Sequence, residues 1–201
     1  MKKVLLFGAG KSATILIDYL VSNAEKENWF VTVVDADLQL AQSKIGVSDL
    51  TKAISFDIND RSERIKFINE SDIVISLLPP ALHTIVAKSC IELNKNLLTA
   101  SYVDEEIRNL KSEIENKNLL FLCEMGLDPG IDHMSAMKII DKIHEEKGTV
   151  TSFQSHCGGL VAPESDDNPW HYKISWNPRN IIMAGKSGAH FRQDGDRKSV
   201  V

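Results

Sequence analysis

Cysteine is scarce in this chain of 201 residues, which contains only Cys90, Cys123 and Cys157. An odd number at wide spacing excludes a disulfide-stabilised scaffold and provides no CxxC pair for zinc. Long apolar runs are also lacking. The run near the N-terminus stops at Phe7, too early for the core of a signal peptide, and no run approaches the roughly 20 residues of a membrane span. We therefore expect a cytoplasmic protein with reduced thiols.

Positive charge is not in excess either. The chain has 23 lysines and arginines against 28 aspartates and glutamates, so its formal net charge is −5. This deficit of positive charge argues against nucleic acid and anionic membranes as partners. The hydrophobic content of 43% is that of an ordinary folded domain and excludes a disordered chain.

Short apolar runs alternate with amphipathic segments before Gly126. The runs predict strands at 3–7, 30–34, 51–58, 73–78, 96–100 and 119–123. The segments between them predict helices at 12–24, 37–44, 60–69, 81–94 and 105–115, the first with an apolar stripe of Ile15, Leu16, Tyr19 and Leu20. Continuous apolar strands are typical of a sheet covered on both faces, so we predict an α/β fold with a Rossmann-type doubly wound parallel sheet.

The pattern changes near Gly126. A longer helix is predicted at 131–146, a strand at 149–156 and a polar loop at 158–178. We therefore predict two domains. Residues 1–125 form a dinucleotide-binding domain, and residues 126–201 form the start of a second α/β domain, for substrate and dimerisation, which they do not complete alone.

A glycine-rich loop, Gly8-Ala9-Gly10-Lys11-Ser12-Ala13, follows the first predicted strand and opens the first predicted helix. In this GxGxxA pattern, Gly8 permits a tight turn, Gly10 lets a pyrophosphate approach the backbone, and Ala13 allows close packing of helix on strand. The helix start, with Lys11 and Ser12, offers free N–H groups to phosphates. The alternative is a glycine turn that binds nothing.

Asp35 ends the second predicted strand about 25 residues after the loop, near the spacing expected for a ribose-binding carboxylate. A carboxylate there repels a 2′-phosphate, and no arginine follows it in residues 36–40. The cofactor is therefore NAD or NADP, with NAD favoured. The alternative for Asp35 is an N-cap of the next helix.

Further polar groups follow the later strands. Ser101 and Tyr102 come after the fifth strand and should lie near cofactor or substrate, because ligands bind at the carboxyl ends of strands in such sheets. The alternative is that Ser101 and Tyr102 only form the turn and pack against their neighbours. Asp128, Asp132 and His133 are residue types that can bind a metal ion. At the start of a helix, however, such residues more often act as helix caps and hydrogen-bond partners, so we predict no metal site.

Several dense motifs resemble the saccharopine dehydrogenase family, specifically its glutamate-forming saccharopine reductases. The matching segments are GAGKSA, SLLPP, ASYV, EMGLDPGIDHM, HCGGLVAPESDDNPW and YKISWNPRN, in order from residue 8 to about residue 180. The resemblance implies a Rossmann domain, an inserted substrate domain, a small amino-acid substrate and a homodimer. It covers only the N-terminal part of such enzymes, so we expect a fragment that is inactive alone. The family's carboxylate-binding arginine would lie beyond Val201.

The resemblance also implies roles for individual residues. Asp57 and Ile58 would contact the adenine side, Ser101 both cofactor and saccharopine, and Asn177 the cofactor. Together with Gly8 and Asp35, which are inferred from the residues themselves, the predicted cofactor contacts are Gly10, Lys11, Ser12, Ala13, Asp57, Ile58, Leu77, Leu78, Ser101, Leu127, Asp128, Pro129 and Asn177. The catalytic candidates for proton transfer are Asp128, Tyr102 and Cys157, although all three could act only by shaping the electrostatics of the site.

The implied reaction is NAD(P)-dependent oxidation of saccharopine in lysine metabolism. Hydride leaves the lysine-side carbon, water adds to the resulting imine, and glutamate and 2-aminoadipate 6-semialdehyde are released. Two alternatives stay open. One is a carboxynorspermidine- or homospermidine-type enzyme of the same fold, and the other is a truncated NAD-binding chain without turnover.

Overall fold

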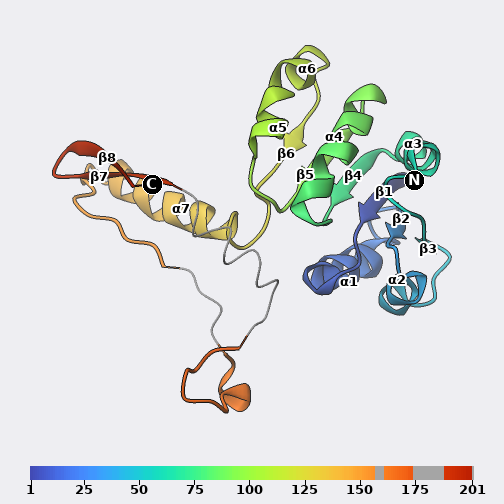
Figure 1. The fold of residues 1–201 in the computed structure, drawn as a ribbon, viewed down its shortest axis with the longest axis horizontal. Coiled ribbons are helices and arrows are strands. Elements are labelled where there is room, and N and C mark those ends of the chain that lie inside the picture. Colours follow the sequence, from blue (N-terminus) through green and yellow to red (C-terminus); the bar gives the residue numbers. More distant parts are fainter. Residues whose placement is uncertain (157–160, 174–187, 201) are drawn as a thin grey trace. The chain divides into compact units, whose positions relative to one another are not determined.

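The computed structural model describes residues 1–156, 161–173 and 188–200 (Figure 1). Two of the predicted site residues, Cys157 and Asn177, lie outside the described residues. The chain divides into two compact units, Met1–Phe153 and Gln154–Val201. All other predicted site residues belong to the first unit.

A six-stranded parallel sheet forms the centre of the first unit, with strand order β3-β2-β1-β4-β5-β6. The strands are β1 (Lys2–Phe7), β2 (Trp29–Val34), β3 (Thr51–Ile54), β4 (Ile73–Ser76), β5 (Asn96–Thr99) and β6 (Phe121–Leu122). This order places β1 beside β4, where the direction of winding reverses, as in dinucleotide-binding folds. The predicted Rossmann-type parallel sheet is therefore confirmed.

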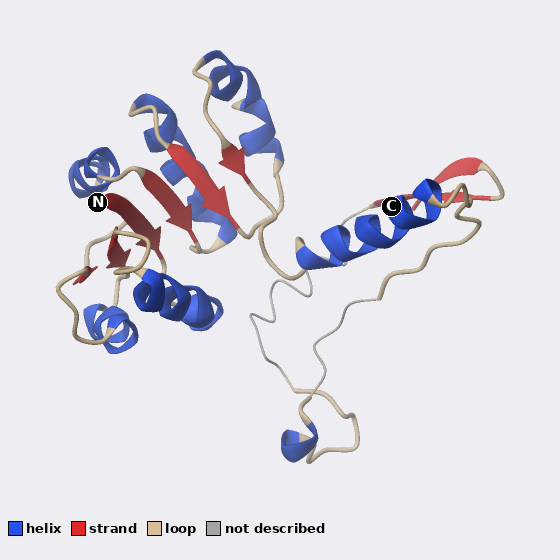
Figure 2. Cartoon of the chain, turned by 180° about the vertical axis from the view of Figure 1, so that it is seen from behind, coloured by secondary structure: helices blue, strands red, loops and turns tan. Residues whose placement is uncertain are grey.

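Helices cover both faces of this sheet (Figures 1 and 2). They are η1 (Lys11–Ala13), α1 (Thr14–Asn23), α2 (Leu38–Ile45), α3 (Arg61–Glu70), η2 (Pro80–Leu82), α4 (His83–Glu92), α5 (Glu105–Asn109) and α6 (Lys111–Asn116). Successive side chains of a strand point to opposite faces of the sheet, so β1 contributes side chains to two hydrophobic cores. Leu5 and Phe7 join the core under α3, α4 and α5, and Val4 and Leu6 join the core under α1 and α2.

The stripe predicted for the first helix is partly wrong. Ile15 and Tyr19 are 79% and 57% exposed, and the buried positions are instead Ala13, Ile17 and Leu20. Ala13 sits in the 3₁₀ turn at the start of the helix and is fully packed against the sheet. The spacing of four and then three residues from Ala13 keeps the same face inward, and this turns positions 15 and 19 outward.

Two element boundaries also differ from the prediction. The third strand ends at Ile54 rather than at residue 58, because its pairing with β2 stops at Val34. Asp57 then closes a turn by accepting a hydrogen bond from the Asn59 N–H at 2.9 Å. The helix predicted at 105–115 is two short helices that meet at Leu110.

Beyond the sheet, α7 (Ile131–Glu145) agrees with the predicted helix. The strand predicted at 149–156 is wrong, because these residues have no strand structure. An alternating pattern needs a hydrogen-bonded neighbour to become a strand, and both described sheets are formed by other segments.

The second unit contains the short 3₁₀ helix η3 (Pro163–Ser165) and an antiparallel hairpin of β7 (Ala189–Gln193) and β8 (Asp196–Val200). Asp194 and Gly195 form its two-residue turn with φ of 53° and 83°, which is the conformation that Asp-Gly favours. Among the described residues, no helix combines the length and hydropathy needed to cross a membrane.

Candidate functional site

The point where the sheet reverses its winding places two loops side by side. The Leu77 N–H donates to the Phe7 carbonyl at 2.8 Å, and the Gly8 N–H donates to the Val34 carbonyl at 2.8 Å. The loops after β1, β2 and β4 therefore leave the sheet together at its carboxyl edge. This is the crevice in which open α/β sheets bind their ligands.

The glycine loop has the geometry of a phosphate cradle. Gly8 has a φ of +98°, and a Cβ there would lie 2.7 Å from the Leu77 carbonyl oxygen, so only glycine fits. A Cβ on Gly10 would meet no atom within 4 Å. The space above Gly10 is therefore free for a ligand at the start of the helix, where backbone N–H groups favour an anion. These residues fit a dinucleotide pyrophosphate.

Lys44 of α2 adds a positive charge beside this loop. Its Nζ donates to the Gly10 carbonyl at 2.7 Å and to Thr14 Oγ1 at 2.8 Å. Lys11 and Ser12, the other predicted phosphate-loop residues, are exposed at the helix start. The sequence reasoning missed Lys44, because nothing in the pattern of α2 shows that its last turn reaches the glycine loop.

Asp35 connects the second strand to the glycine loop. Its Oδ2 accepts a hydrogen bond from the Ala9 N–H at 2.7 Å, and its Oδ1 accepts one from the Asp37 N–H at 2.9 Å. The N-cap alternative for Asp35 is wrong, because Asp37 caps α2 by accepting from the Leu40 N–H. A carboxylate has about four acceptor sites, so two remain for ribose hydroxyls.

The two residues predicted on the adenine side follow β3. The Asp57 carboxylate accepts from both the backbone and side-chain N–H groups of Asn59, each at 2.9 Å. Ile58 is buried, and its carbonyl accepts a hydrogen bond from the buried Arg64 of α3. Arg64 also donates to Ser89 Oγ of α4 at 3.0 Å. This arginine, which sequence reasoning missed, fixes the loop to two helices.

Leu77 and Leu78 are half-buried, and their side chains pack on opposite cores. Their assignment as cofactor contacts stays a prediction.

The loops after β5 and β6 bring the catalytic candidates together. The Glu124 N–H donates to the Ser101 carbonyl at 3.0 Å, and the Met125 N–H donates to the Thr99 carbonyl at 3.1 Å. This pairing places Tyr102 beside Asp128, and the phenol donates to Asp128 Oδ1 at 2.8 Å.

The hydrogen bond to Asp128 raises the pKa of Tyr102 to about 12. The phenol therefore keeps its proton at neutral pH and cannot serve as a base there. Asp128 accepts this hydrogen bond, and its catalytic role stays a prediction. Cys157, the third catalytic candidate, lies outside the described residues.

A tight turn positions Asp128 at the start of α7. The Gly126 N–H donates to the Pro129 carbonyl at 2.9 Å, and Gly130 approaches Gly126 so closely that a Cβ on Gly130 would lie 2.1 Å from the Gly126 carbonyl oxygen. Leu127 is exposed beside Asp128, and Pro129 is buried. The two glycines and the proline of this motif therefore form the tight turn that positions the Asp128 carboxylate.

The other polar groups of this turn form local hydrogen bonds. Asp132 Oδ1 accepts from the Gly130 N–H at 2.8 Å and lies 2.8 Å from His133 Nδ1. Asp128 is bonded to Tyr102 instead. The hydrogen bond with Asp132 raises the pKa of His133. Within residues 1–156, 161–173 and 188–200, no group of three His, Cys, Asp or Glu is arranged to hold a metal ion.

The two described cysteines, Cys90 and Cys123, favour the protonated thiol. Burial raises the pKa of Cys90 to about 12, and burial also raises the pKa of Cys123. A thiol must ionise to act as a nucleophile, so neither of them is a catalytic candidate.

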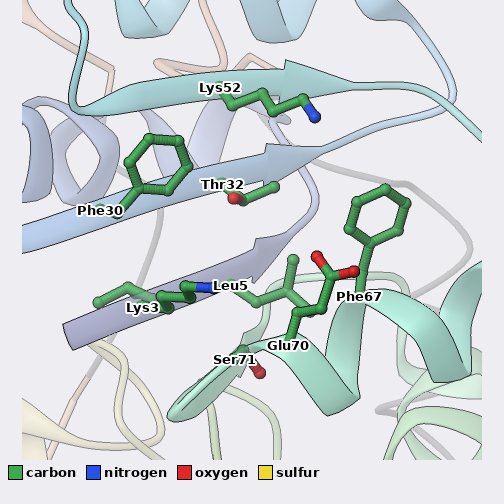
Figure 3. A pocket seen from close by; sticks show the side chains of 9 residues that line it. Lys3, Leu5, Phe30, Thr32, Lys52, Phe67, Glu70 and Ser71 are labelled. Atoms are coloured by element: carbon green, nitrogen blue, oxygen red, sulfur yellow. The ribbon is translucent and has the colours of Figure 1, made fainter. Parts of the chain in front are cut away.

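A small pocket lies elsewhere, toward the amino-terminal ends of β1 and β2 (Figure 3). Its volume is about 140 Å³, and it is lined by Lys3, Val4, Leu5, Phe30, Thr32, Lys52, Phe67, Glu70 and Ser71. Small-molecule sites usually start at about 300 Å³. This pocket is therefore too small for a dinucleotide and is not part of the site at the carboxyl ends of the strands.

Two domain families match this chain. Residues 4–122 match the one described as Saccharopine dehydrogenase NADP binding domain, and residues 126–201 match the Saccharopine dehydrogenase C-terminal domain. Alpha-aminoadipic semialdehyde synthase of Arabidopsis thaliana is 42% identical over 211 residues, covering 96% of this chain and 20% of the plant protein.

Saccharopine dehydrogenase (NADP(+), L-glutamate-forming) of Saccharomyces cerevisiae is 41% identical over 199 residues, covering 99% of this chain and 44% of the yeast protein. The solved structure of the apo, histidine-tagged, L-Glu-forming saccharopine dehydrogenase of that yeast has a TM-score of 0.83 and 40% identity, covering 100% of this chain and 44% of its own. The chain thus spans less than half the length of these relatives.

Proposed function

Because this chain belongs to the saccharopine dehydrogenase family, we propose that the protein carries out the NAD(P)-dependent oxidation of saccharopine to glutamate and 2-aminoadipate 6-semialdehyde. We assign residues 1–125 to cofactor binding and residues 126–201 to part of the substrate domain, which agrees with the two matched family ranges. The observation that carries the proposal is the pairing of Tyr102 with Asp128 at the same sheet edge as the glycine loop.

The residues of this edge have distinct tasks in the proposed reaction. The glycine loop would hold the pyrophosphate of a bound NAD(P), and the nicotinamide of that cofactor would supply the acceptor for the hydride from the lysine-side carbon of saccharopine. Asp128 would accept a proton from the substrate nitrogen and release it to solvent. It would then accept a proton from the water that attacks the imine and pass that same proton to the nitrogen of the departing glutamate. Tyr102 holds the Asp128 carboxylate in one orientation by its hydrogen bond.

Cofactor preference is a separate proposal. The fungal relatives carry NADP(+) in their names. In this chain Asp35 follows β2, and its carboxylate would repel the 2′-phosphate of a bound NADP. We propose that this protein uses NAD in preference to NADP. Equal catalytic efficiency with the two cofactors would contradict the preference and leave the reaction itself untouched.

The protein produced from its complete gene tests the reaction. We expect saccharopine to reduce the cofactor and carboxynorspermidine to give no signal; the reverse result would replace the proposed substrate with a polyamine precursor. Asp128→Asn keeps an acceptor for Tyr102 but cannot exchange a proton, so kcat should fall about 100-fold or more. The 201-residue chain alone should bind the cofactor without turnover.

Assembly and location complete the proposal. We propose a homodimer in the cytosol, although the bovine relative, 38% identical, is named mitochondrial. Light scattering at micromolar concentration and cell fractionation measure the two properties. A monomer, or recovery with mitochondria, would contradict them.

A further inference from the structure

A buried histidine lies within hydrogen-bond distance of Ser101, and the proposed function assigns it no role. His83 begins α4 and is only 3% exposed. Its Nδ1 lies 2.9 Å from Ser76 Oγ, at the end of β4, and its Nε2 lies 2.7 Å from Ser101 Oγ, just after β5. The imidazole therefore bridges the carboxyl ends of two neighbouring strands at the ligand edge of the sheet.

The partners of Ser76 decide which nitrogen of His83 carries the proton. Ser76 is fully buried, and among the described residues its hydroxyl has one hydrogen-bond partner, His83 Nδ1. A buried hydroxyl proton without an acceptor costs about 1–3 kcal/mol, so Ser76 donates and Nδ1 accepts. Thr99 Oγ1, 3.4 Å from each ring nitrogen, adds a second hydroxyl whose proton favours an acceptor nitrogen.

Burial keeps this imidazole neutral. Desolvation lowers the pKa of His83, and the charge of Asp104 opposes this only in part. A neutral imidazole has one donor and one acceptor nitrogen. Because Nδ1 accepts from Ser76, the proton resides on Nε2, which then donates to Ser101 Oγ.

We propose that His83 is a positioning residue that makes the Ser101 hydroxyl a hydrogen-bond donor toward the ligand. The oxygen of Ser101 accepts from His83 Nε2, so the hydroxyl proton is free to point into the crevice. Ser101 is half-buried and follows β5 at the carboxyl edge. The group it selects is an acceptor oxygen, such as a substrate carboxylate or the carboxamide of the cofactor. The ligand role of Ser101 rests on the proposed function; the protonation state of His83 does not.

Two substitutions test separately the hydrogen bonds that His83 forms with Ser76 and with Ser101. His83→Gln places an amide near the Nε2 position and can still donate to Ser101, but it leaves Ser76 without its acceptor. We expect lower thermal stability with ligand affinity within about twofold of the wild type. His83→Asn places an oxygen near the Nδ1 position and can still accept from Ser76, but it cannot reach Ser101. We expect stability close to that of the wild type and ligand affinity weakened about 5- to 10-fold.

The two possible sources of the acceptor oxygen give different readouts. Weakening of the binary complex with NADH would place the acceptor on the cofactor, and a higher KM for saccharopine at unchanged kcat would place it on the substrate. Ser101→Ala should show the same weakening as His83→Asn, and the double variant should be no worse than Ser101→Ala alone. If His83→Asn binds both ligands like the wild type while Ser101→Ala does not, the proposal fails.

Nitrogen NMR of the 201-residue chain tests the protonation state without any ligand or turnover. The resonances of His83 are assigned by their loss in His83→Gln, and we expect a protonated Nε2 and a bare Nδ1. A protonated Nδ1 would overturn the proposal. A bare Nδ1 together with no turnover of saccharopine would leave the bridge standing and refute only the substrate.

Discussion

Gly8 and Gly10 belong to one loop but have different physical requirements. Gly8 needs its positive φ and its close approach to Leu77, and Gly10, with a φ of −61°, faces open space. Gly10→Val should therefore leave the melting temperature nearly unchanged while weakening dinucleotide binding more than tenfold, because the new side chain occupies pyrophosphate space. Isothermal titration with NADH measures the affinity.

The matched control is Gly8→Ala. The added methyl group meets the Leu77 carbonyl at 2.7 Å in a backbone conformation that alanine rarely adopts. We expect a loss of about 1–3 kcal/mol in the free energy of unfolding. Unchanged NADH affinity in Gly10→Val would show that the dinucleotide lies elsewhere.

Asp35 determines cofactor preference in our interpretation. Asp35→Ser combined with Ala36→Arg removes the repelling carboxylate and adds a guanidinium for the 2′-phosphate, so the ratio of NADPH to NADH affinity should rise at least tenfold. Since Asp35 also accepts from the Ala9 N–H, both affinities could fall together through a loosened loop. The ratio is therefore the decisive quantity, and an unchanged ratio would contradict this interpretation of the second strand.

At the scale of elements, Arg64 connects α3 to α4 and to the loop that follows β3. Arg64→Met leaves the Ile58 carbonyl and the Ser89 hydroxyl without their charged donor. We expect a loss of about 1–3 kcal/mol in the free energy of unfolding. Urea denaturation measures it.

Arg61, three residues earlier on α3, provides the control for Arg64. It forms an exposed ion pair with Glu92 at 2.7 Å, and exposed pairs contribute about 1 kcal/mol or less. Arg61→Met should therefore change stability less than Arg64→Met. Equal losses in the two variants would show that the buried network has no special role.

The order of strands and helices in the first unit could be predicted because each element carries its own periodicity. Element ends were less predictable, since they depend on partners: β3 stops where β2 stops pairing. The same reason explains the wrong strand at 149–156 and the unpredicted hairpin of β7 and β8.

The candidate site was predictable only where a residue type has a local cause. The glycine loop and Asp128 belong to dense motifs, and the resemblance that those motifs indicated is confirmed by the two matched families. His83, Lys44 and Arg64 act across distances of 18, 34 and 25 residues. A periodic pattern cannot show which distant partner a polar side chain will meet.

At the scale of the whole molecule, two histidines affect the pH dependence of stability with opposite signs. Desolvation lowers the pKa of His83 from the ordinary value of 6.5, so below that pH the unfolded chain takes up a proton that the folded chain refuses. The free energy of unfolding then decreases as the pH falls. The pKa of exposed His133 is raised by its hydrogen bond with Asp132, so its contribution is present at low pH and lost as the pH rises.

The two contributions are separable by denaturation curves between pH 8 and pH 5. For the wild type, His83 alone should remove up to about 1.4 kcal/mol per pH unit below 6.5, which is the effect of one proton. His83→Gln starts from a lower stability, but its curve should be flatter by this amount because glutamine does not titrate. His133→Gln should make the acid slope slightly steeper, since it removes a group that favours the folded state at low pH. Parallel curves for the wild type and His83→Gln would mean that the buried imidazole gains its proton in the folded state as readily as in the unfolded chain. That result would contradict the neutral bridge between Ser76 and Ser101.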